Sequence, residues 1–331
     1  MPHILGTLRG DLLVARGRSG GRLRRRAGAT RGVYAFFAPV SYSADTDPSS
    51  AGFDEHLGYE ADLLTALAAM DGAGLSFARQ GIAEWSDIWL QAAGPEFDLV
   101  GGGITIIDAR TRNAAGDQVV TFTSGHIAFR QSLLVRAADA ARFAHYSDLT
   151  SQARVGVLGG TTGEFRLLEL TGLVDAQGVL AAFTRIQTPE GELVADGTAS
   201  YTITAAGTSA NLVGRQRLIP PEAHMPQVIY LGGETGEAEL LEALQSGQID
   251  AIARGEIGNR DAGYASDSSL VVTALDEAAE PGGFALGADD TELAACLDEK
   301  INYLTDNRRI GYPEWRANPA VFLERAEQWR P

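Results

Sequence analysis

One short segment of the chain brings together groups that can hold an anion. It runs from Gly101 to Arg110 and reads GGGITIIDAR, so that backbone amides, the Thr105 hydroxyl and a guanidinium lie close in sequence. The planar guanidinium of an arginine matches the two oxygens of a carboxylate, which makes Arg110 a candidate carboxylate ligand. The alternative is a solvated loop arginine that forms a salt bridge with Asp108.

A second glycine-rich turn, GGTTG at residues 159–163, follows a predicted strand and precedes an apolar helix that begins at Glu164. Backbone amides at such a helix N-terminus can bind an anion. The turn has neither the Lys-Ser/Thr pair of a phosphate-binding P-loop nor the G-x-G-x-x-G spacing of a dinucleotide site. We therefore interpret it as a site for a small carboxylate or as a plain tight turn.

Patterns typical of other chemistries are missing from the sequence. The five histidines lack metal-ligand spacing, and no G-x-S-x-G motif of a serine hydrolase is present. The single cysteine, Cys296, excludes an internal disulfide and a cysteine-rich metal site, so we expect no metal and no cofactor. A group of acids is interpreted as the solvated face of a helix: Glu234, Glu237, Glu239 and Glu242.

Charge is divided unevenly along the 331 residues, whose net charge is −16. The first 31 residues contain eight arginines and one acid and carry +7, which leaves −23 on the other 300. A body this acidic repels phosphate backbones, so we do not expect it to bind nucleic acid. No apolar run approaches the ~18 residues that a spanning helix needs, which argues against an integral membrane protein.

The basic segment at residues 1–30 is rich in Arg and Gly and indicates a flexible tail. The apolar run after it, Val33 to Val40, is short and contains Pro39, so no secretion signal is visible. The alternatives for this segment are a leader-like basic region, a tether to nucleic acid or anionic lipid, and a misplaced start codon.

From residue 31 onward, short apolar strands alternate with helical patterns, which is typical of an α/β fold. The segment YEADLLTALAAM, for example, places its leucines on one face of a helix. The patterns predict strands at 31–42, 75–78, 97–103, 127–136, 154–158 and 249–253, and helices at 59–70, 85–93, from 164, at 237–245 and at 292–304. Residues 186–227 are interpreted as an inserted loop or hairpin.

Over residues 31–331 the chain resembles the family 3 extracellular solute-binding proteins, the amino-acid receptors of ABC importers. Seven segments carry the resemblance, in the order in which the family has them: APVSY (38–42), GYEADL (58–63), the stretch from Trp85 to FDLV (97–100), GITIIDAR (103–110), RVGVLGGTTG (154–163), ALQSGQIDA (243–251) and the helix at 289–304. Each motif alone is weakly specific, but their shared order favours this family.

The resemblance implies a type II periplasmic-binding-protein fold: a two-lobed α/β clamp in which helices flank a mixed β-sheet in each lobe. Residues 31–124 and 282–331 would form lobe 1, and residues 125–281 would form lobe 2, with the insertion at about 186–227. The implied function is that of a non-enzymatic, monomeric substrate-binding protein of an ABC importer, in the periplasm or at the cell surface. Its ligand would be a small carboxylate-bearing solute, with an amino acid as the first choice, and its partners would be the membrane subunits of the transporter.

The resemblance also implies roles for individual residues in the cleft between the lobes. Arg110 would bind the α-carboxylate of the ligand, assisted by Thr105 and the amide of Gly103. Thr162, with its neighbour Thr161, would bind the same carboxylate from the N-terminus of the helix in the second lobe.

Two aromatic residues, Trp85 and Phe37, fall where the family stacks rings on the ligand side chain, and core packing is the alternative for both. The family's acid for the α-amino group is expected near Gly255, but in this chain the acid is the next residue, Glu256. In addition, Gly163 removes a side chain that often reaches the ligand.

A second function is compatible with the same scaffold. The chain is also similar to cyclohexadienyl or arogenate dehydratases, which dehydrate a carboxylated ring. Glu256 or Glu164 would be the general acid here, its pKa raised by burial. A sensor domain is a third reading, for which the sequence shows no output segment.

Overall fold

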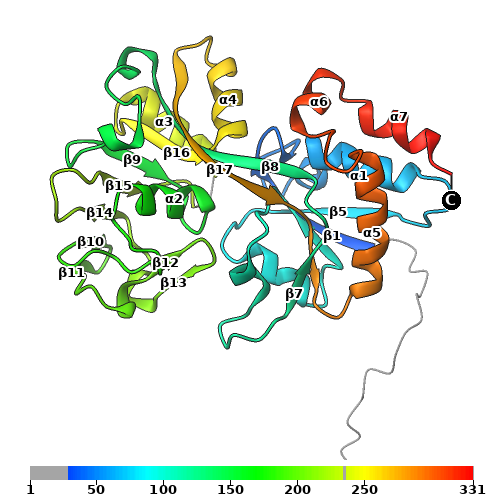
Figure 1. Cartoon of the computed structure of the whole chain (residues 1–331), viewed down its shortest axis with the longest axis horizontal. Coiled ribbons are helices and arrows are strands. Elements are labelled where there is room, and N and C mark those ends of the chain that lie inside the picture. The colour runs from blue at the N-terminus through cyan, green and yellow to red at the C-terminus, as the bar shows by residue number, and fades with distance from the viewer. Residues whose placement is uncertain (1–28, 234–235, 331) are drawn as a thin grey trace, which may run out of the picture.

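The structure, a computed structural model, describes residues 29–233 and 236–330. Nearly all of the predicted basic tail therefore lies outside the described residues. The described chain forms two lobes that lie side by side, each built around one sheet (Figure 1). We call the lobe around the five-stranded sheet the first lobe and the lobe around the eight-stranded sheet the second lobe.

The sheet of the first lobe has the strand order β5-β1-β6-β18-β7. Strands β5, β1 and β6 are parallel, whereas β18 is antiparallel to both of its neighbours. The strands of this lobe are β1 (Ala29–Tyr34), β5 (Phe77–Ile82), β6 (Leu99–Gly101), β7 (Val120–Phe122) and β18 (Ala285–Gly287), with a small sheet of β2 (Phe36–Phe37), β3 (Ser41–Ser43) and β4 (His56–Leu57).

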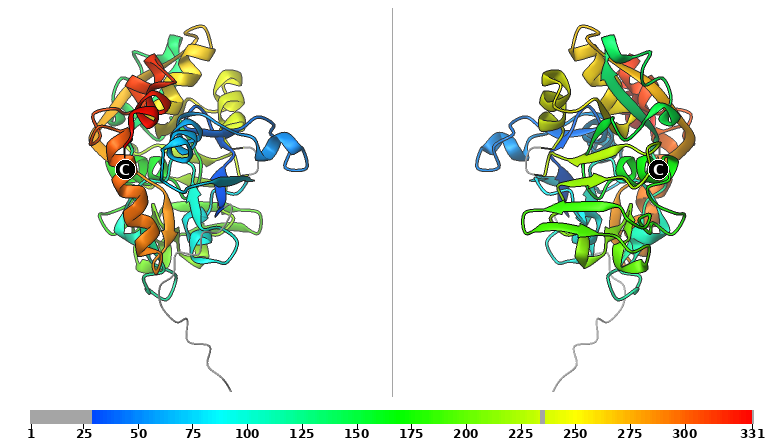
Figure 2. Two further views of the ribbon diagram at one scale, coloured as in Figure 1. Left: turned by 90° about the vertical axis from the view of Figure 1, so that its right-hand side faces the viewer. Right: turned by 90° about the vertical axis from the view of Figure 1, so that its left-hand side faces the viewer.

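Four helices of the described chain belong to the first lobe, and they share one apolar core. They are α1 (Tyr59–Ala69), α5 (Thr291–Leu304), α6 (Tyr312–Ala317) and α7 (Val321–Gln328). The face of α1 with Leu63 and Leu67 is fully buried and packs in one cluster with Leu297 of α5 and Phe322 of α7. Figure 1 shows α5 to α7, in orange and red, at the outer end of this lobe, on the side that faces the viewer in the left view of Figure 2.

The sheet of the second lobe has the order β11-β10-β14-β15-β9-β16-β8-β17, and strands β15, β9 and β16 are parallel. Its strands are β8 (Ile127–Arg136), β9 (Arg154–Val157), β10 (Arg185–Thr188), β11 (Gly191–Val194), β14 (Arg217–Ile219), β15 (Gln227–Tyr230), β16 (Ala251–Gly255) and β17 (Leu270–Gly282). The helices are α2 (Thr162–Leu170), α3 (Glu237–Ser246) and α4 (Glu256–Ala265).

Residues 186–227, which we interpreted as an inserted loop or hairpin, form several strands. They complete β10 and supply β11 and β14, which extend the sheet in antiparallel fashion beyond β15. They also form a separate hairpin from β12 (Ile203–Thr204) and β13 (Gly207–Thr208). The insertion strands, in green, lie at the end of the molecule opposite to α5–α7 (Figure 1).

Two crossings connect the lobes. The chain passes to the second sheet between β7 and β8 and returns between β17 and β18. Strands β8 and β17 pair with each other along their length, from Ile127 opposite Gly282 to Arg136 opposite Leu270 (Figure 1). The predicted lobe boundaries at 124–125 and 281–282 lie beside these crossings and stay a prediction.

Parallel strands place their carboxyl ends at one edge of a sheet, where ligands of open α/β sheets bind. In the first lobe, the segments after β1, β5 and β6 therefore emerge together, and they carry Phe37, Trp85 and Thr105. In the second lobe, the segments after β9, β15 and β16 do the same, and they carry Thr162 and Glu237. The strand order thus explains why residues far apart in sequence meet in one cleft.

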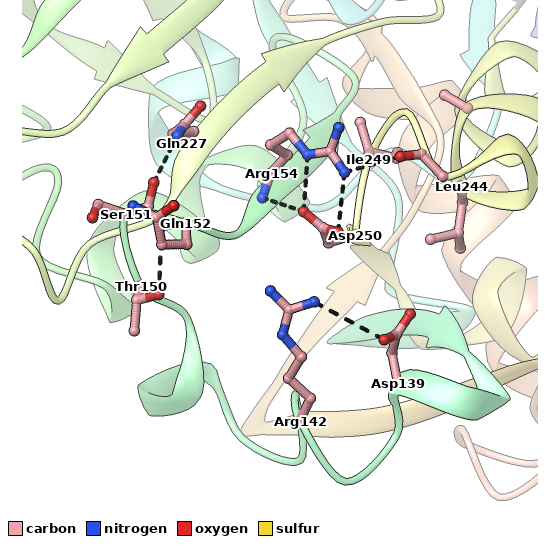
Figure 3. Close-up of polar contacts among 12 residues, drawn as sticks. Asp139, Arg142, Thr150, Ser151, Gln152, Arg154, Gln227, Leu244, Ile249 and Asp250 are labelled. Atoms are coloured by element: carbon pink, nitrogen blue, oxygen red, sulfur yellow. Dashed lines mark hydrogen bonds and ion pairs between the residues drawn. The ribbon is translucent and has the colours of Figure 1, made fainter.

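An ion pair ties β9 to β16 at the opposite, amino ends of these strands (Figure 3). The carboxylate of Asp250 accepts hydrogen bonds from the backbone N–H of Arg154 at 2.9 Å and from its Nε at 3.0 Å. Arg154 Nη2 also donates to the carbonyl of Gly247, at the C-terminus of α3, at 2.9 Å. The aspartate of the QIDA motif therefore holds two central strands in register. Asp139 pairs with Arg142 nearby (Figure 3).

Most predicted elements are present with shifted ends. The predicted helix at 85–93 is a 3₁₀ helix at Ile88–Ala93, and the predicted strand at 31–42 ends at Tyr34. The other 3₁₀ helices are Ala51–Asp54, Asp108–Thr111, Ala137–Asp139, Tyr146–Asp148, Ala199–Tyr201 and Ala210–Leu212. Among residues 29–233 and 236–330, no helix is long and apolar enough to cross a membrane.

Candidate ligand-binding cleft

A cavity of about 70 Å³ lies between the carboxyl edges of the two sheets. From the first lobe it is lined by Tyr34, Phe37, Trp85, Gly103 and Thr105. From the second lobe it is lined by Gln131, Thr161, Thr162, Glu237, Arg254 and Gly255, among others. Sites for drug-sized ligands have volumes of roughly 300–1,000 Å³, so this cavity suits a solute of few heavy atoms.

A buried carboxylate shapes the first-lobe wall of the cavity. Glu60, fully buried on α1, accepts hydrogen bonds from the amides of Gly102 at 2.7 Å and Gly103 at 3.0 Å. His126 Nε2 lies 3.1 Å from the same carboxylate. Gly103 has a φ of +72°, and a Cβ there would lie 2.5 Å from the ring of Phe37. This turn therefore requires glycine, and its amides are directed toward Glu60 rather than toward the cavity.

The second-lobe wall is the N-terminus of α2. Thr161 is its N-cap: its hydroxyl accepts a hydrogen bond from the amide of Glu164 at 3.1 Å. The buried carboxylate of Glu164 accepts from the amide of Gly160 and from Nη2 of Arg215, both at 2.6 Å. Arg215 belongs to the insertion, so the insertion fixes the turn that places Thr162 at the cavity.

The two walls touch at several polar contacts. The hydroxyls of Thr105 and Thr162 are 3.4 Å apart, and the indole of Trp85 donates to the carbonyl of Gly160 at 3.0 Å. Thr105 and Thr162 are almost fully buried. These contacts join the lobes directly, so the structure shows the closed arrangement of the cleft.

Arg110 lies fully buried behind Thr105 and lines neither the cavity nor its neighbour. Its guanidinium donates to three carbonyls: Ala205 at 3.0 Å, Thr105 at 3.2 Å and Gly160 at 3.4 Å. It also lies over the ring of Trp89, 4.3 Å from the ring centre. The alternative of a solvated arginine paired with Asp108 is therefore wrong, because Asp108 pairs with Arg112 instead.

Within the described residues, no carboxylate forms an ion pair with Arg110. Complete burial lowers the pKa of Arg110 to about 9, and the more distant carboxylates of Glu280 and Asp87 offset only part of this effect. The role of Arg110 as ligand to a carboxylate stays a prediction, since it requires the guanidinium to exchange carbonyl bonds for ligand bonds.

Aromatic rings cover the first-lobe side of the cavity. Trp85 and Tyr34 pack edge to face with ring centres 5.1 Å apart, and Phe37 lies 5.8 Å from Phe129 of the second lobe. Burial, together with the nearby carboxylates of Glu237 and Glu84, raises the pKa of Tyr34. Trp85 and Phe37 line the cavity, so core packing alone does not describe them.

Glu256, like Arg110, is a predicted site residue that does not line the cavity. Its carboxylate forms an ion pair with Arg260, one turn further along α4. Gly255 lines the cavity in its place but offers no side chain. The end of β16 therefore brings no acid into the cleft among the described residues.

The cavity residues that were not predicted from the sequence include Glu237, Arg254 and Gln131. The interpretation of Glu237 as part of a solvated helix face is wrong, because Glu237 pairs with Arg254 at the cavity. Glu239 and Glu242 are exposed, as that interpretation requires, and Glu234 lies outside the described residues. The useful signal was position, since Glu237 follows β15, one of the three parallel strands that end at the cleft.

A larger cavity of about 950 Å³ lies beside the first one. Trp85 and Leu158 line both cavities, and the Trp85–Gly160 hydrogen bond lies between them. Residues of the β12–β13 hairpin and of the segment from Glu84 to Leu90 line the larger cavity.

No family model matches the chain, and no curated protein matches it in sequence. Solved structures match its fold. An ancestral arginine-binding protein bound to arginine has a TM-score of 0.57 at 16% identity, over 93% of this chain and 100% of that one. The amino-acid ABC transporter substrate-binding protein AbpA from Streptococcus pneumoniae, bound to L-arginine, has a TM-score of 0.56 at 16% identity, over 90% and 95%.

A third match is AncCDT-1, an ancestral amino-acid-binding protein described as a precursor of cyclohexadienyl dehydratase. Its TM-score is 0.55 at 18% identity, over 92% of this chain and 96% of that one. At such identities the likeness shows the fold, and at that level it confirms the resemblance to the family 3 solute-binding proteins. The chain therefore has the two-lobed α/β fold of the periplasmic amino-acid-binding proteins.

Proposed function

We propose that the chain is a substrate-binding protein that closes its two lobes around a small carboxylate-bearing solute, by preference an amino acid. The observation that carries this proposal is Arg110, a fully buried cation without a carboxylate partner within the described chain. A buried charge is costly unless it is paired, and a ligand carboxylate would provide the pair.

The second-lobe wall supports the same ligand. The N-terminus of α2 carries a partial positive charge and free amide groups, which favour an anion at Thr162. Arg110 already reaches the carbonyl of Gly160, in the turn before this helix, by the longest of its three hydrogen bonds, 3.4 Å. A carboxylate between Arg110 and the helix end would replace that weak bond with stronger, charge-assisted ones.

Closure follows from this arrangement. A solute that binds residues of both lobes stabilises the closed state over the open one by its contacts to the second lobe. The two strands that connect the lobes, β8 and β17, provide the segments about which the lobes can separate.

Transport is the role we propose for this binding. Proteins of the same fold include the ABC transporter substrate-binding protein AbpA and the arginine-, lysine-, histidine-binding protein ArtJ from Geobacillus stearothermophilus. By that likeness the chain would deliver its solute to the membrane subunits of an ABC importer from the periplasm or the cell surface. We propose that it acts as a monomer.

Dehydratase activity is the weaker alternative. The two acids considered for protonation, Glu256 and Glu164, do not line the cavity. Glu256 pairs with Arg260, and Glu164 is held by Arg215 and the amide of Gly160. Neither carboxyl is therefore placed to donate a proton to a bound solute in this arrangement.

A thermal-shift screen over the twenty L-amino acids and a set of small carboxylates tests the proposal. A ligand at about one hundred times its Kd stabilises the native state by about 2.7 kcal/mol, which is readily measured as a rise in Tm. We expect at least one amino acid to raise the Tm. Prephenate and arogenate are included, because release of an aromatic product from either would show that the protein is a dehydratase rather than a binding protein. A screen in which no compound raises the Tm would refute the proposal.

A further inference from the structure

An amino-acid ligand brings an ammonium group into the cavity as well as a carboxylate. The end of β16 cannot receive it, because Gly255 has no side chain and Glu256 does not line the cavity and is paired with Arg260. A hydrogen-bond acceptor for the ammonium group must therefore come from another element that lines the cavity.

Glu237 is the carboxylate that lines the cavity. It is the first residue of α3 and forms an ion pair with Nη1 of Arg254. Arg254 is itself fixed from behind, because its Nε donates to Asn259 at 2.7 Å and its Nη2 to the carbonyl of Gly258 at 2.8 Å. The arginine thus holds the Glu237 carboxylate in place and leaves part of its acceptor capacity unused.

Gln131 provides a second acceptor. Its side-chain amide group donates to the hydroxyl of Thr162 at 3.0 Å and to the carboxylate of Glu280 at 3.1 Å. Since a carboxylate only accepts, the amide nitrogen is fixed on that side and Oε1 is left as the free atom. Gln131 is 3% exposed, and its Oε1 has no partner among the described residues. A buried acceptor without a donor is costly, so it indicates a donor supplied by a ligand or a water.

Charge differs between the two sides of the site. The N-terminus of α2 lines the cavity and favours the negative end of a ligand, and Arg110 adds positive charge behind Thr105, outside the cavity lining. The carboxylate of Glu237 and the free oxygen of Gln131 favour a hydrogen-bond donor that carries positive charge. Burial raises the pKa of Glu237, and Arg254 offsets only part of this effect, so a further cation beside this carboxyl would be stabilising.

We propose that Glu237, assisted by Oε1 of Gln131, receives the α-ammonium group of the ligand, so that the cleft selects amino acids over carboxylic acids that lack the amine. This inference rests on the proposed function. The acid for the ammonium group is thereby provided by the N-terminus of α3 rather than by the end of β16.

The test compares each amino acid that binds with the same molecule without its amine, for example L-alanine with propionate. Dissociation constants are measured by calorimetry for the wild-type protein and for Glu237→Gln. Glu242→Gln, an exposed glutamate on the same helix, is the matched control. Gln131→Met is a second variant that keeps the Glu237–Arg254 ion pair, and circular dichroism checks that each variant folds.

We expect the wild-type protein to bind the amino acid at least tenfold more tightly than its des-amino counterpart. Glu237→Gln should weaken amino-acid binding at least tenfold and change the affinity for the counterpart less than twofold, and Gln131→Met should weaken amino-acid binding alone. Glu242→Gln should behave as the wild type does.

Equal weakening of both ligands by Glu237→Gln, or no weakening of either, would overturn the inference and leave the proposed function standing. So would a wild-type protein that binds the des-amino acid as tightly as the amino acid. If Glu237→Gln fails to fold, two measurements decide instead. They are the effect of Gln131→Met on the affinities for the amino acid and its des-amino counterpart, and the preference of the wild-type protein between these two ligands. If neither class of compound binds the wild-type protein, the proposed function and this inference both fall.

Discussion

Gly103 is constrained by its own backbone and by the ring beside it. Its φ is +72°, and a Cβ would lie 2.5 Å from Phe37, a residue that lines the cavity. We expect Gly103→Ala to lower the free energy of unfolding by about 1–3 kcal/mol through backbone strain and to displace Phe37, which should weaken ligand binding. Urea unfolding and calorimetric titration measure the two effects separately.

Gly116 is the matched control for that substitution. Its φ is +85°, and a Cβ there would meet nothing within 4 Å. Gly116→Ala should therefore show the cost in stability without the loss of affinity. If Gly103→Ala binds ligand as tightly as Gly116→Ala does, Phe37 does not form part of the binding surface.

Individual site residues could be predicted from the sequence where a motif fixes them to a strand end. Thr105, Thr162, Trp85 and Phe37 line the cavity, and their contact with a ligand stays a prediction. Glu237 was not predicted as a site residue, because its spacing in the sequence also fits an exposed helix face. The position of its carboxylate depends on the ion pair with Arg254, which the sequence does not show.

Gln131 was missed for a similar reason. It occurs within a strand whose pattern indicates burial, and the sequence does not show which buried polar side chain lacks a partner.

At the scale of elements, the Asp250–Arg154 ion pair makes a prediction about acid stability. Partial burial opposes ionisation of Asp250, but the hydrogen bonds from Arg154 outweigh it, so the pKa of Asp250 lies below its ordinary value. The stability that the pair provides is therefore present at neutral pH and is lost as the pH falls through this lowered pKa, below about 4.

We expect Asp250→Asn to lower the free energy of unfolding at pH 7 by about 1–3 kcal/mol and to make it less dependent on acid pH. Urea unfolding at pH 7 and at pH 3 measures both effects. Asp108→Asn, which removes an exposed ion pair with Arg112, should change stability by less than about 1 kcal/mol. An Asp250→Asn protein with wild-type stability and acid sensitivity would show that the pair does not hold β9 to β16.

The hairpin of β12 and β13 joins the lobes in a way the sequence did not reveal. Its tip residue Ala205 accepts a hydrogen bond from Arg110, and Ala206 packs against the apolar cluster that contains Trp85 and Trp89. We expect Ala206→Asp to place a charge against these rings and so favour separated lobes. Small-angle scattering of the ligand-free protein should then give a larger radius of gyration than the wild type, and an unchanged radius would show that the hairpin does not hold the lobes together.

Regular elements with a clear apolar period were predictable because burial of one face dictates the period. Helix α1 is the clearest case, with its leucines in the core. The strands of the insertion were not predictable as a sheet extension, because β11 is exposed along its whole length and so has no buried face whose pattern would mark it.

For the molecule as a whole, the account requires two lobes that share one ligand. Residues of both sheets line one small cavity, and polar contacts between Thr105 and Thr162 and between Trp85 and Gly160 join the lobes. The two-lobed architecture was predictable from the order of the motifs. The hydrogen bonds from Arg110 to backbone carbonyls were not predictable, because they depend on how closely the insertion approaches the first lobe.

Calorimetric titration of Arg110→Met with an amino acid that binds the wild type tests the central claim most directly. Arg112→Met, an exposed neighbour paired with Asp108, is the control. Loss of a charge-assisted contact to a carboxylate costs about 1.5–3 kcal/mol, so Arg110→Met should bind roughly 10- to 150-fold more weakly while Arg112→Met binds as the wild type does. If folded Arg110→Met binds the amino acid with wild-type affinity, the buried guanidinium holds the two lobes together and does not bind the ligand, and the account is wrong.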